Sequence, residues 1–134
     1  MKRFIIHTDG GARGNPGPSG IGVLIEDQDG NTVLEHSRYL GEVTNNQAEY
    51  TAVIDALEHS KERGAEELEF YLDSELVVRQ LNGDYRVKDR DLAKLFLKVW
   101  NLKSSFRKVT FTHIRREQNK RADRLANEAM DRGM

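Results

Sequence analysis

The sequence predicts an α/β fold in which a five-stranded mixed sheet, three antiparallel strands followed by two parallel ones, carries helices on both faces. Short alternating apolar runs bounded by glycine and aspartate indicate the strands. Apolar residues at spacings of three and four indicate the helices. The predicted order is three strands, a helix, a strand, two helices, a strand and a helix, which is typical of helices packed on a central sheet.

Length and composition favour one intracellular domain. The 134 residues match the commonest size of a single domain, so residues 1–134 are expected to fold as one unit. The chain has no cysteine, which excludes disulfides, thiolate zinc sites and a cysteine nucleophile. The N-terminus offers only the short apolar run Phe4-Ile5-Ile6, too short for a signal peptide or a membrane span. We therefore expect a cytoplasmic monomer without membrane contact.

Three antiparallel strands are predicted at the start of the chain. The first runs from Lys2 to Asp9, the second from Gly20 to Asp27 and the third from Thr32 to Leu40. The segment from Gly10 to Gly20 is predicted to be a glycine-rich turn, and Asp29-Gly30 is a hairpin signal. Asp9 is accordingly expected at a strand end.

The first predicted helix begins at a capping box, Thr44 to Gln47, and ends near Gly64. Its apolar face is formed by Ala48, Ala52, Val53, Ala56 and Leu57. Glu49 precedes Ala52 and Val53 by three and four positions, so we expect its side chain on the buried side of the helix.

The rest of the chain alternates between segments with the apolar pattern of a strand and segments with that of a helix. Glu67 to Asp73 is a predicted strand that again ends on an aspartate. The later elements are helices at Ser74–Leu81 and Asp91–Leu102, a strand at Arg107–His113 and a helix at Asn119–Met130.

Asp9, Glu49 and Asp73 are candidate metal ligands. A single aspartate at a strand end usually bonds only to nearby backbone amides. If the first and fourth strands are neighbours that end at the same edge, however, Asp9 and Asp73 converge, and Glu49 can join them. Three buried acids without basic partners repel one another, so such a cluster implies bound cations. All-oxygen ligands select hard metals such as magnesium or manganese.

Charge is segregated along the chain. Residues 1–100 carry 12 basic and 18 acidic side chains, whereas residues 101–134 carry 9 and 4. A basic surface beside an acidic cluster suits a metal-using enzyme that acts on nucleic acid. A solvated basic helix at the C-terminus explains the same charges equally well.

Four segments in series resemble the motifs of ribonuclease H type 1. They are Thr8-Asp9-Gly10-Gly11-Ala12-Arg13-Gly14-Asn15-Pro16-Gly17-Pro18, Thr44-Asn45-Asn46-Gln47-Ala48-Glu49, Asp73-Ser74, and His113 with Asn119-Lys120-Arg121-Ala122-Asp123. The resemblance covers essentially the whole chain and implies a ribonuclease H-like fold.

The resemblance also implies an activity. Asp9, Glu49, Asp73 and Asp123 would hold two Mg²⁺ ions, for which Mn²⁺ can substitute, in a two-metal-ion mechanism. The family hydrolyses the RNA strand of RNA/DNA hybrids as an endonuclease and leaves 5′-phosphate and 3′-hydroxyl ends. His113 would be catalytic through proton transfer or product release; the alternative for His113 is a strand end that points its imidazole at solvent.

The same resemblance, together with the basic residues near the C-terminus, assigns contacts to the hybrid. The candidate residues are Gly10, Gly11, Gly14, Asn15, Asn45, Asn46, Ser74, Arg115, Arg116, Lys120 and Arg121. An asparagine amide can donate to or accept from the 2′-hydroxyl that distinguishes RNA from DNA. Capping of the helix start explains one of Asn45 and Asn46 but hardly both.

The chain departs from the family pattern at two places. Leu81 to Lys103 is short and lacks the basic, tryptophan-bearing insertion of many bacterial members, so hybrid affinity should be lower and strongly salt-dependent. Glu75 stands where many relatives have glutamine. Two alternatives stay open: a relative that binds nucleic acid but cuts it weakly or not at all, and a nuclease of the same fold that also cuts duplex RNA.

Overall fold

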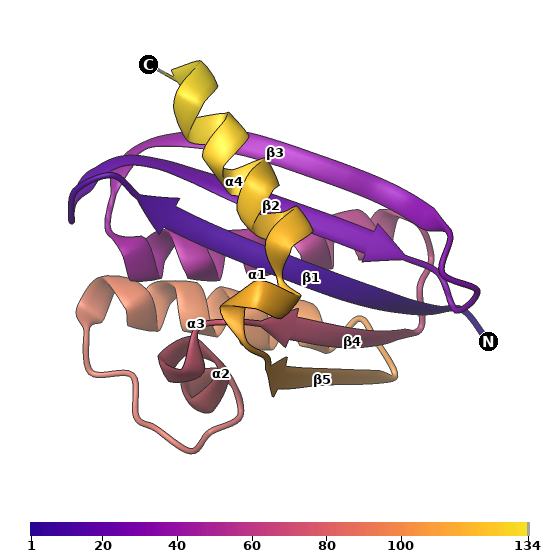
Figure 1. Cartoon of the computed structure of the whole chain (residues 1–134). Coiled ribbons are helices and arrows are strands. Elements are labelled where there is room, and N and C mark those ends of the chain that lie inside the picture. Colours follow the sequence, from indigo (N-terminus) through magenta and orange to yellow (C-terminus); the bar gives the residue numbers. More distant parts are fainter. Residues whose placement is uncertain (134) are drawn as a thin grey trace.

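The protein is built around one five-stranded sheet, shown in Figure 1 for a computed structural model that describes residues 1–133. The strand order across the sheet is β3-β2-β1-β4-β5. The strands are β1 (Arg3–Ala12), β2 (Gly17–Glu26), β3 (Thr32–Val43), β4 (Glu67–Leu72) and β5 (Lys108–His113). The pairs β1–β2 and β2–β3 are antiparallel, whereas β1–β4 and β4–β5 are parallel. The predicted mixed sheet is confirmed.

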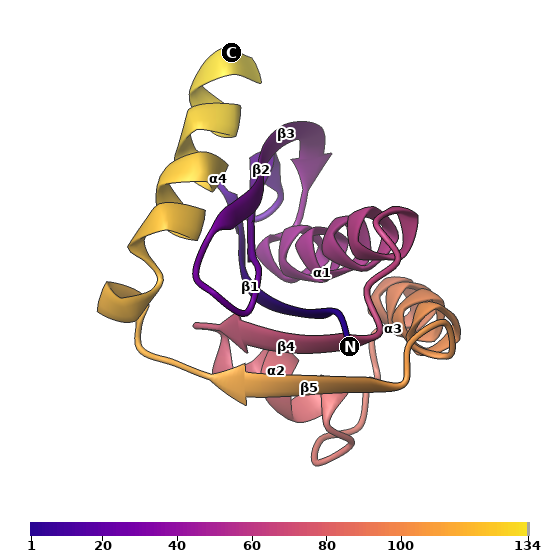
Figure 2. The ribbon, with the colours of Figure 1, turned by 90° about the vertical axis from the view of Figure 1, so that its right-hand side faces the viewer.

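Helices cover both faces of the sheet, as predicted. They are α1 (Asn45–Glu62), α2 (Glu75–Leu81), α3 (Arg90–Lys103) and α4 (Lys120–Gly133), with a 3₁₀ turn, η1 (Arg116–Gln118), before α4. Figure 2 shows α4 on one side of β1, β2 and β3, with α1 and α3 on the opposite side. Only residues 82–89 connect α2 to α3, so the chain has the short form of this region. None of the helices within residues 1–133 is long and apolar enough to span a bilayer.

Side chains alternate along β1 and β4 between the face of the sheet that packs in the main core and the face that carries α4. Phe4 and Ile6 of β1, with Phe70 and Leu72 of β4, are buried in the main core beneath α1. Because neighbouring residues in a strand point to opposite faces, His7 and Asp9 point to the face that carries α4. Both aspartates of the candidate site therefore continue rows of residues that face away from the main core.

The predicted turn from Gly10 to Gly20 is wrong. β1 continues to Ala12 and β2 begins at Gly17, with Gly10 paired to Ile21 and Gly11 to Gly20. Asp9 consequently lies inside β1 and not at its end. Pairing of β1 with β4 nevertheless stops at His7 and Tyr71, so Asp9 lies just beyond the last parallel pair. Glycines carry no apolar side chain, and the alternation that marks a strand is therefore invisible in this stretch.

Two glycines let helices rest directly on the sheet. A Cβ atom at Gly10 would overlap the backbone of Ala48 and Glu49 near the start of α1. A Cβ atom at Gly22, the partner of Asp9 on β2, would overlap the carbonyl oxygen of Ala122 in α4. The starts of both helices are therefore brought within backbone contact of the strands.

The start of α1 lies where the sequence predicts it. Thr44 Oγ1 accepts a hydrogen bond from the Gln47 amide at 3.2 Å, and Gln47 Oε1 accepts from the Thr44 amide at 2.8 Å. This reciprocal pair satisfies two amides that a helix start leaves without partners. It also places Glu49 in the turn that contacts Gly10.

Gly10→Ala tests the close approach of α1 to β1. We expect the free energy of unfolding to fall by about 1–3 kcal/mol or more, because a methyl group there must displace the α1 backbone. The matched control is Gly11→Ala, whose Cβ would lie 3.5 Å from Met130 Cε, an ordinary contact. Urea denaturation of both variants provides the measurement, and an equal loss of stability in the two would contradict the account.

Candidate active site

Three carboxylates from three separate elements converge at one end of the sheet. Asp9 comes from β1, Asp73 follows the end of β4, and Glu49 is the fifth residue of α1. Each offers a carboxylate oxygen, and these oxygens lie within 4.8 Å of one another. The predicted convergence of Asp9, Glu49 and Asp73 is confirmed.

Asp123 lies beside this cluster. It is in the first turn of α4, which rests on β2 at Gly22, and it borders the same cavity of about 310 Å³ as Asp9, Glu49 and Asp73. Together with burial and the charge of Asp73, the charge of Asp123 helps to raise the pKa of Asp9, so Asp123 acts electrostatically on the cluster. The four acidic residues therefore form one connected group around a cavity that opens to solvent.

Burial and mutual repulsion oppose ionisation of the cluster. Asp9 is 8% exposed and Glu49 is 3% exposed. Burial, followed by the charges of Asp73 and Asp123, raises the pKa of Asp9 to about 8. Burial, followed by the charges of Asp9 and Asp73, likewise raises the pKa of Glu49.

Little positive charge compensates these acids. Arg116 Nη2 lies 3.8 Å from Asp123 Oδ1, but its side chain is 79% exposed. Arg13 also borders the cavity and instead pairs with Asp131 at 2.7 Å. Glu49 Oε2 is buried and accepts no hydrogen bond from residues 1–133. An all-oxygen set with an unpartnered buried acceptor fits a hard divalent cation.

His113 is close to the cluster but outside the cavity. It ends β5 in register with Leu72, the residue before Asp73. Its side chain is exposed, and it does not line the 310 Å³ cavity. The structure thus brings His113 to the edge of the candidate site.

Asn15 and Asn45 fasten the β1–β2 loop to the start of α1. Asn45 Oδ1 accepts from the Ala12 amide at 3.2 Å, and Asn15 Oδ1 accepts from the Asn45 amide at 3.0 Å. Because both side-chain oxygens are engaged by backbone donors, the amide NH₂ groups are the free ends. Both residues are exposed, and Asn45 borders the cavity.

The other predicted contact residues occupy different positions. Gly10 is buried against α1, and both Gly10 and Gly11 border the cavity. Gly14 has a φ of 101° in the β1–β2 loop, a backbone conformation that favours glycine. Asn46 is partly buried and does not border the cavity. Ser74 caps α2 by accepting from the Val77 amide at 3.3 Å.

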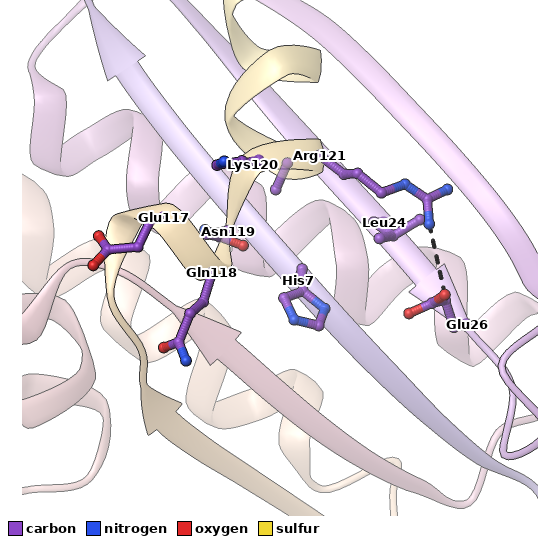
Figure 3. Close-up of a pocket in the computed structure, with 9 residues that line it drawn as sticks. His7, Leu24, Glu26, Glu117, Gln118, Asn119, Lys120 and Arg121 are labelled. Atoms are coloured by element: carbon purple, nitrogen blue, oxygen red, sulfur yellow. Dashed lines mark ion pairs between the residues drawn. The ribbon is translucent and has the colours of Figure 1, made fainter.

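The four basic candidates divide into two groups. Arg115, Arg116 and Lys120 are exposed around η1 and the start of α4, and of these Arg116 reaches the acidic cavity. Arg121 points away from it. Arg121 Nη2 lies 2.7 Å from Glu35 Oε1 and Nη1 lies 3.6 Å from Glu26 Oε2, beside a second cavity shown in Figure 3.

Four residues that border the acidic cavity were not predicted from the sequence: Ala12, Arg13, Asn127 and Met130. Asn127 Nδ2 donates to the Asp123 carbonyl oxygen at 3.0 Å. Its position four residues after Asp123 places both on one helix face, so helical spacing could have identified it. Arg13 lies within the first motif and could have been found there.

Comparison with known proteins agrees with this geometry. The family described as reverse transcriptase-like matches residues 7–129. Ribonuclease HI of Halobacterium salinarum is 43% identical over 129 residues, which cover 96% of this chain and 65% of that protein. Ribonuclease H of Chlorobium phaeobacteroides is 35% identical over 146 residues, which cover 97% of this chain and 97% of that protein. The chain belongs to the ribonuclease H family.

Solved structures of the ribonuclease H family superpose on nearly the whole chain. The N-terminal RNase H domain of Rv2228c from Mycobacterium tuberculosis has a TM-score of 0.95 and 41% identity, covering 98% of this chain and 96% of that one. LC11-RNase H1, in a complex with an RNA/DNA hybrid, has a TM-score of 0.92 and 51% identity, covering 97% and 98%. The chain spans only about a third of full-length Rv2228c, at 36% of its length and 44% identity.

The pKa of Asp9 leads to a prediction about stability in the presence of a chelator. The folded protein holds a proton on Asp9 that the unfolded chain releases above about pH 4, so the stability that this proton contributes is lost as the pH rises to about 8. Asp9→Asn should remove much of this pH dependence and raise the free energy of unfolding at pH 8 by roughly 2–4 kcal/mol. Denaturation curves at pH 5 and pH 8 measure both effects. If the free energy of unfolding depends on pH identically in the two proteins, folding does not raise the pKa of Asp9.

Proposed function

We propose that residues 1–134 form a single nuclease domain that hydrolyses the RNA strand of RNA/DNA hybrids. The observation that carries the proposal is the convergence of Asp9, Glu49 and Asp73 within 4.8 Å, with Asp123 on the same cavity. A protein that only bound nucleic acid would gain nothing from a buried negative cluster that repels phosphates. The hybrid bound to LC11-RNase H1 and the activity named for the Halobacterium relative support the choice of substrate.

Asp9, Glu49, Asp73 and Asp123 would hold two Mg²⁺ ions, with Mn²⁺ as a substitute. Such ions supply an activated water nucleophile and neutralise the leaving 3′ oxygen, which leaves 5′-phosphate and 3′-hydroxyl ends. The protein supplies carboxylate oxygens from β1, α1, α4 and the residue that follows β4, so elements of the fold hold the ligands in place. Arg116 borders the same cavity, 3.8 Å from Asp123, and its exposed guanidinium would contact the phosphate backbone of the substrate.

The side-chain NH₂ groups of Asn15 and Asn45 would form the hydrogen bonds that recognise the substrate. Their oxygens are engaged by backbone amides, so each presents NH₂ donors toward acceptors such as a 2′-hydroxyl oxygen or a minor-groove base edge. Asn46, Ser74 and the backbone at Gly10, Gly11 and Gly14 would extend this contact. Arg115 and Lys120 are exposed and would contact phosphates. Arg121 would first have to leave Glu35 and Glu26.

His113 would carry protons between the reaction centre and solvent. It lies beside the end of β4, next to Asp73, and its exposed imidazole is free to turn toward a bound substrate. Imidazole is the side chain that enzymes use most often for general acid–base catalysis, which suits this task. A cytoplasmic location and a monomeric state remain predictions from the sequence.

The proposed function is tested with three labelled duplexes of one sequence, RNA/DNA, RNA/RNA and DNA/DNA. We expect cleavage of the RNA strand in the hybrid alone, with Mg²⁺ or Mn²⁺ and not with a chelator, and weaker cleavage as the salt concentration rises. Asp9→Asn should reduce the rate by at least about 100-fold because it removes a metal ligand. Binding without cleavage under every metal would favour the binding protein, and cleavage of RNA/RNA would favour the broader nuclease.

His113→Ala tests the proton-transfer role. We expect kcat to fall by about 10- to 100-fold without a matching rise in KM, because the imidazole would act on the reaction and not on substrate binding. Steady-state kinetics on the hybrid provide the measurement. An unchanged kcat would return His113 to the role of an exposed strand end.

A further inference from the structure

Asn119 is a buried polar residue at the junction of three elements. It lies between η1 and α4, as Figure 3 shows, and is 1% exposed. Its side-chain nitrogen, Nδ2, lies 2.9 Å from the carbonyl oxygen of Thr8 in β1 and 3.1 Å from Oδ2 of Asp73 after β4. One amide group therefore bridges the two strands that carry aspartates of the candidate site.

The orientation of this amide is determined by its neighbours. The Thr8 carbonyl and the Asp73 carboxylate can only accept hydrogen bonds, so the NH₂ group must face both. Asn119 Oδ1 is consequently left buried without a partner among residues 1–133. A buried polar atom without a partner is destabilising, and such atoms concentrate where a residue serves function more than stability.

Asn119 forms hydrogen bonds with two of the four acidic residues, Asp73 and Asp123, and with the residue before a third, Asp9. Thr8 immediately precedes Asp9, so the bond to its carbonyl oxygen fixes the backbone from which Asp9 projects. The bond to Asp73 Oδ2 restrains that carboxylate and leaves its other oxygen, Oδ1, free for a cation. The Asp123 amide donates to the Asn119 carbonyl oxygen at 3.1 Å in the first turn of α4.

We propose that Asn119 is a positioning residue for the cation-binding carboxylates, acting mainly through Asp73. Its NH₂ group holds one carboxylate oxygen so that the other points toward the cluster, and it keeps Asp9 and Asp73 in register across β1 and β4. Partners that orient metal ligands in this way affect metal affinity by about 10- to 100-fold. The inference rests on the proposed function only in taking Asp73 to be a metal ligand.

The simpler alternative is that Asn119 only joins α4 to the sheet. In that case its loss would lower stability in the way that any lost buried hydrogen bond does, and it would leave the cation site unchanged. Asn82, at a more exposed position, provides a control for the loss of such a bond, because its Nδ2 donates to the Phe111 carbonyl oxygen at 3.1 Å and joins the end of α2 to β5 away from the acidic cavity.

The test measures Mn²⁺ binding to the substrate-free protein by calorimetry. We expect Asn119→Ala to raise the Kd for Mn²⁺ by about 10- to 100-fold. We expect Asn82→Ala to lower the melting temperature and leave this Kd unchanged. Asn119→Leu preserves the buried volume without the donor and should match Asn119→Ala; it replaces that variant in every comparison if the smaller side chain prevents folding. An unchanged Kd in a folded Asn119 variant would overturn the proposal.

A double-mutant cycle separates action through Asp73 from other effects. In an Asp73→Asn background, the second substitution Asn119→Ala should change Mn²⁺ binding by less than about 2-fold, because the carboxylate that Asn119 orients is already gone. Fully additive losses would contradict a role through Asp73. Since the readout is metal binding, a protein that binds Mn²⁺ as expected but fails to cut the hybrid would refute the proposed function and leave this inference standing.

Discussion

The start of α1 rests on the backbone of β1 at Gly10, and this contact determines where Glu49 lies. No side chain fits at Gly10, so the helix start can approach the strand until the carboxylates of Glu49 and Asp9 are neighbours. A second contact of the same kind, between α4 and β2 at Gly22, brings Asp123 to the cavity. The parallel pairing of β1 with β4 then adds Asp73. The acidic cluster is thus a consequence of helices that pack directly on the backbone of the strands, and each acidic residue comes from a different part of the fold.

The buried acidic cluster lowers the stability of the folded chain. Buried like charges raise the pKa of Asp9 to about 8, against an ordinary value of 3.8, and raise that of Glu49 as well. The acids are mutually repulsive, and the nearest cation, Arg116, is largely exposed. Local destabilisation of this kind is typical of functional sites, where the surrounding fold holds groups that would otherwise separate. Bound cations would compensate the charge and displace the protons.

Most of the fold follows from local sequence patterns, because apolar alternation and helical spacing survive in nearly every element. The capping box at Thr44 predicted the start of α1 and, with it, the burial of Glu49. The strand boundaries around Gly10 were not predictable from alternation, since glycines carry no apolar signal. Asp123 was recognised through the motif and not through periodicity, which assigns it to an exposed helix face. The partners of Arg121 and Asn119 come from distant strands, and only the folded structure brings them together.

Burial and mutual repulsion raise the pKa of Asp9 to about 8 and also raise that of Glu49, so divalent cations that bind here should displace protons. The direct test is calorimetric titration of the substrate-free protein with Mn²⁺ at pH 7 in buffers of different ionisation enthalpy, which counts the protons released. Because the pKa of Asp9 lies near 8, we expect a net release of about one proton or more on saturation at pH 7, and a smaller release from Asp9 as the pH rises above 8. Tight binding without proton release at pH 7 would contradict this account.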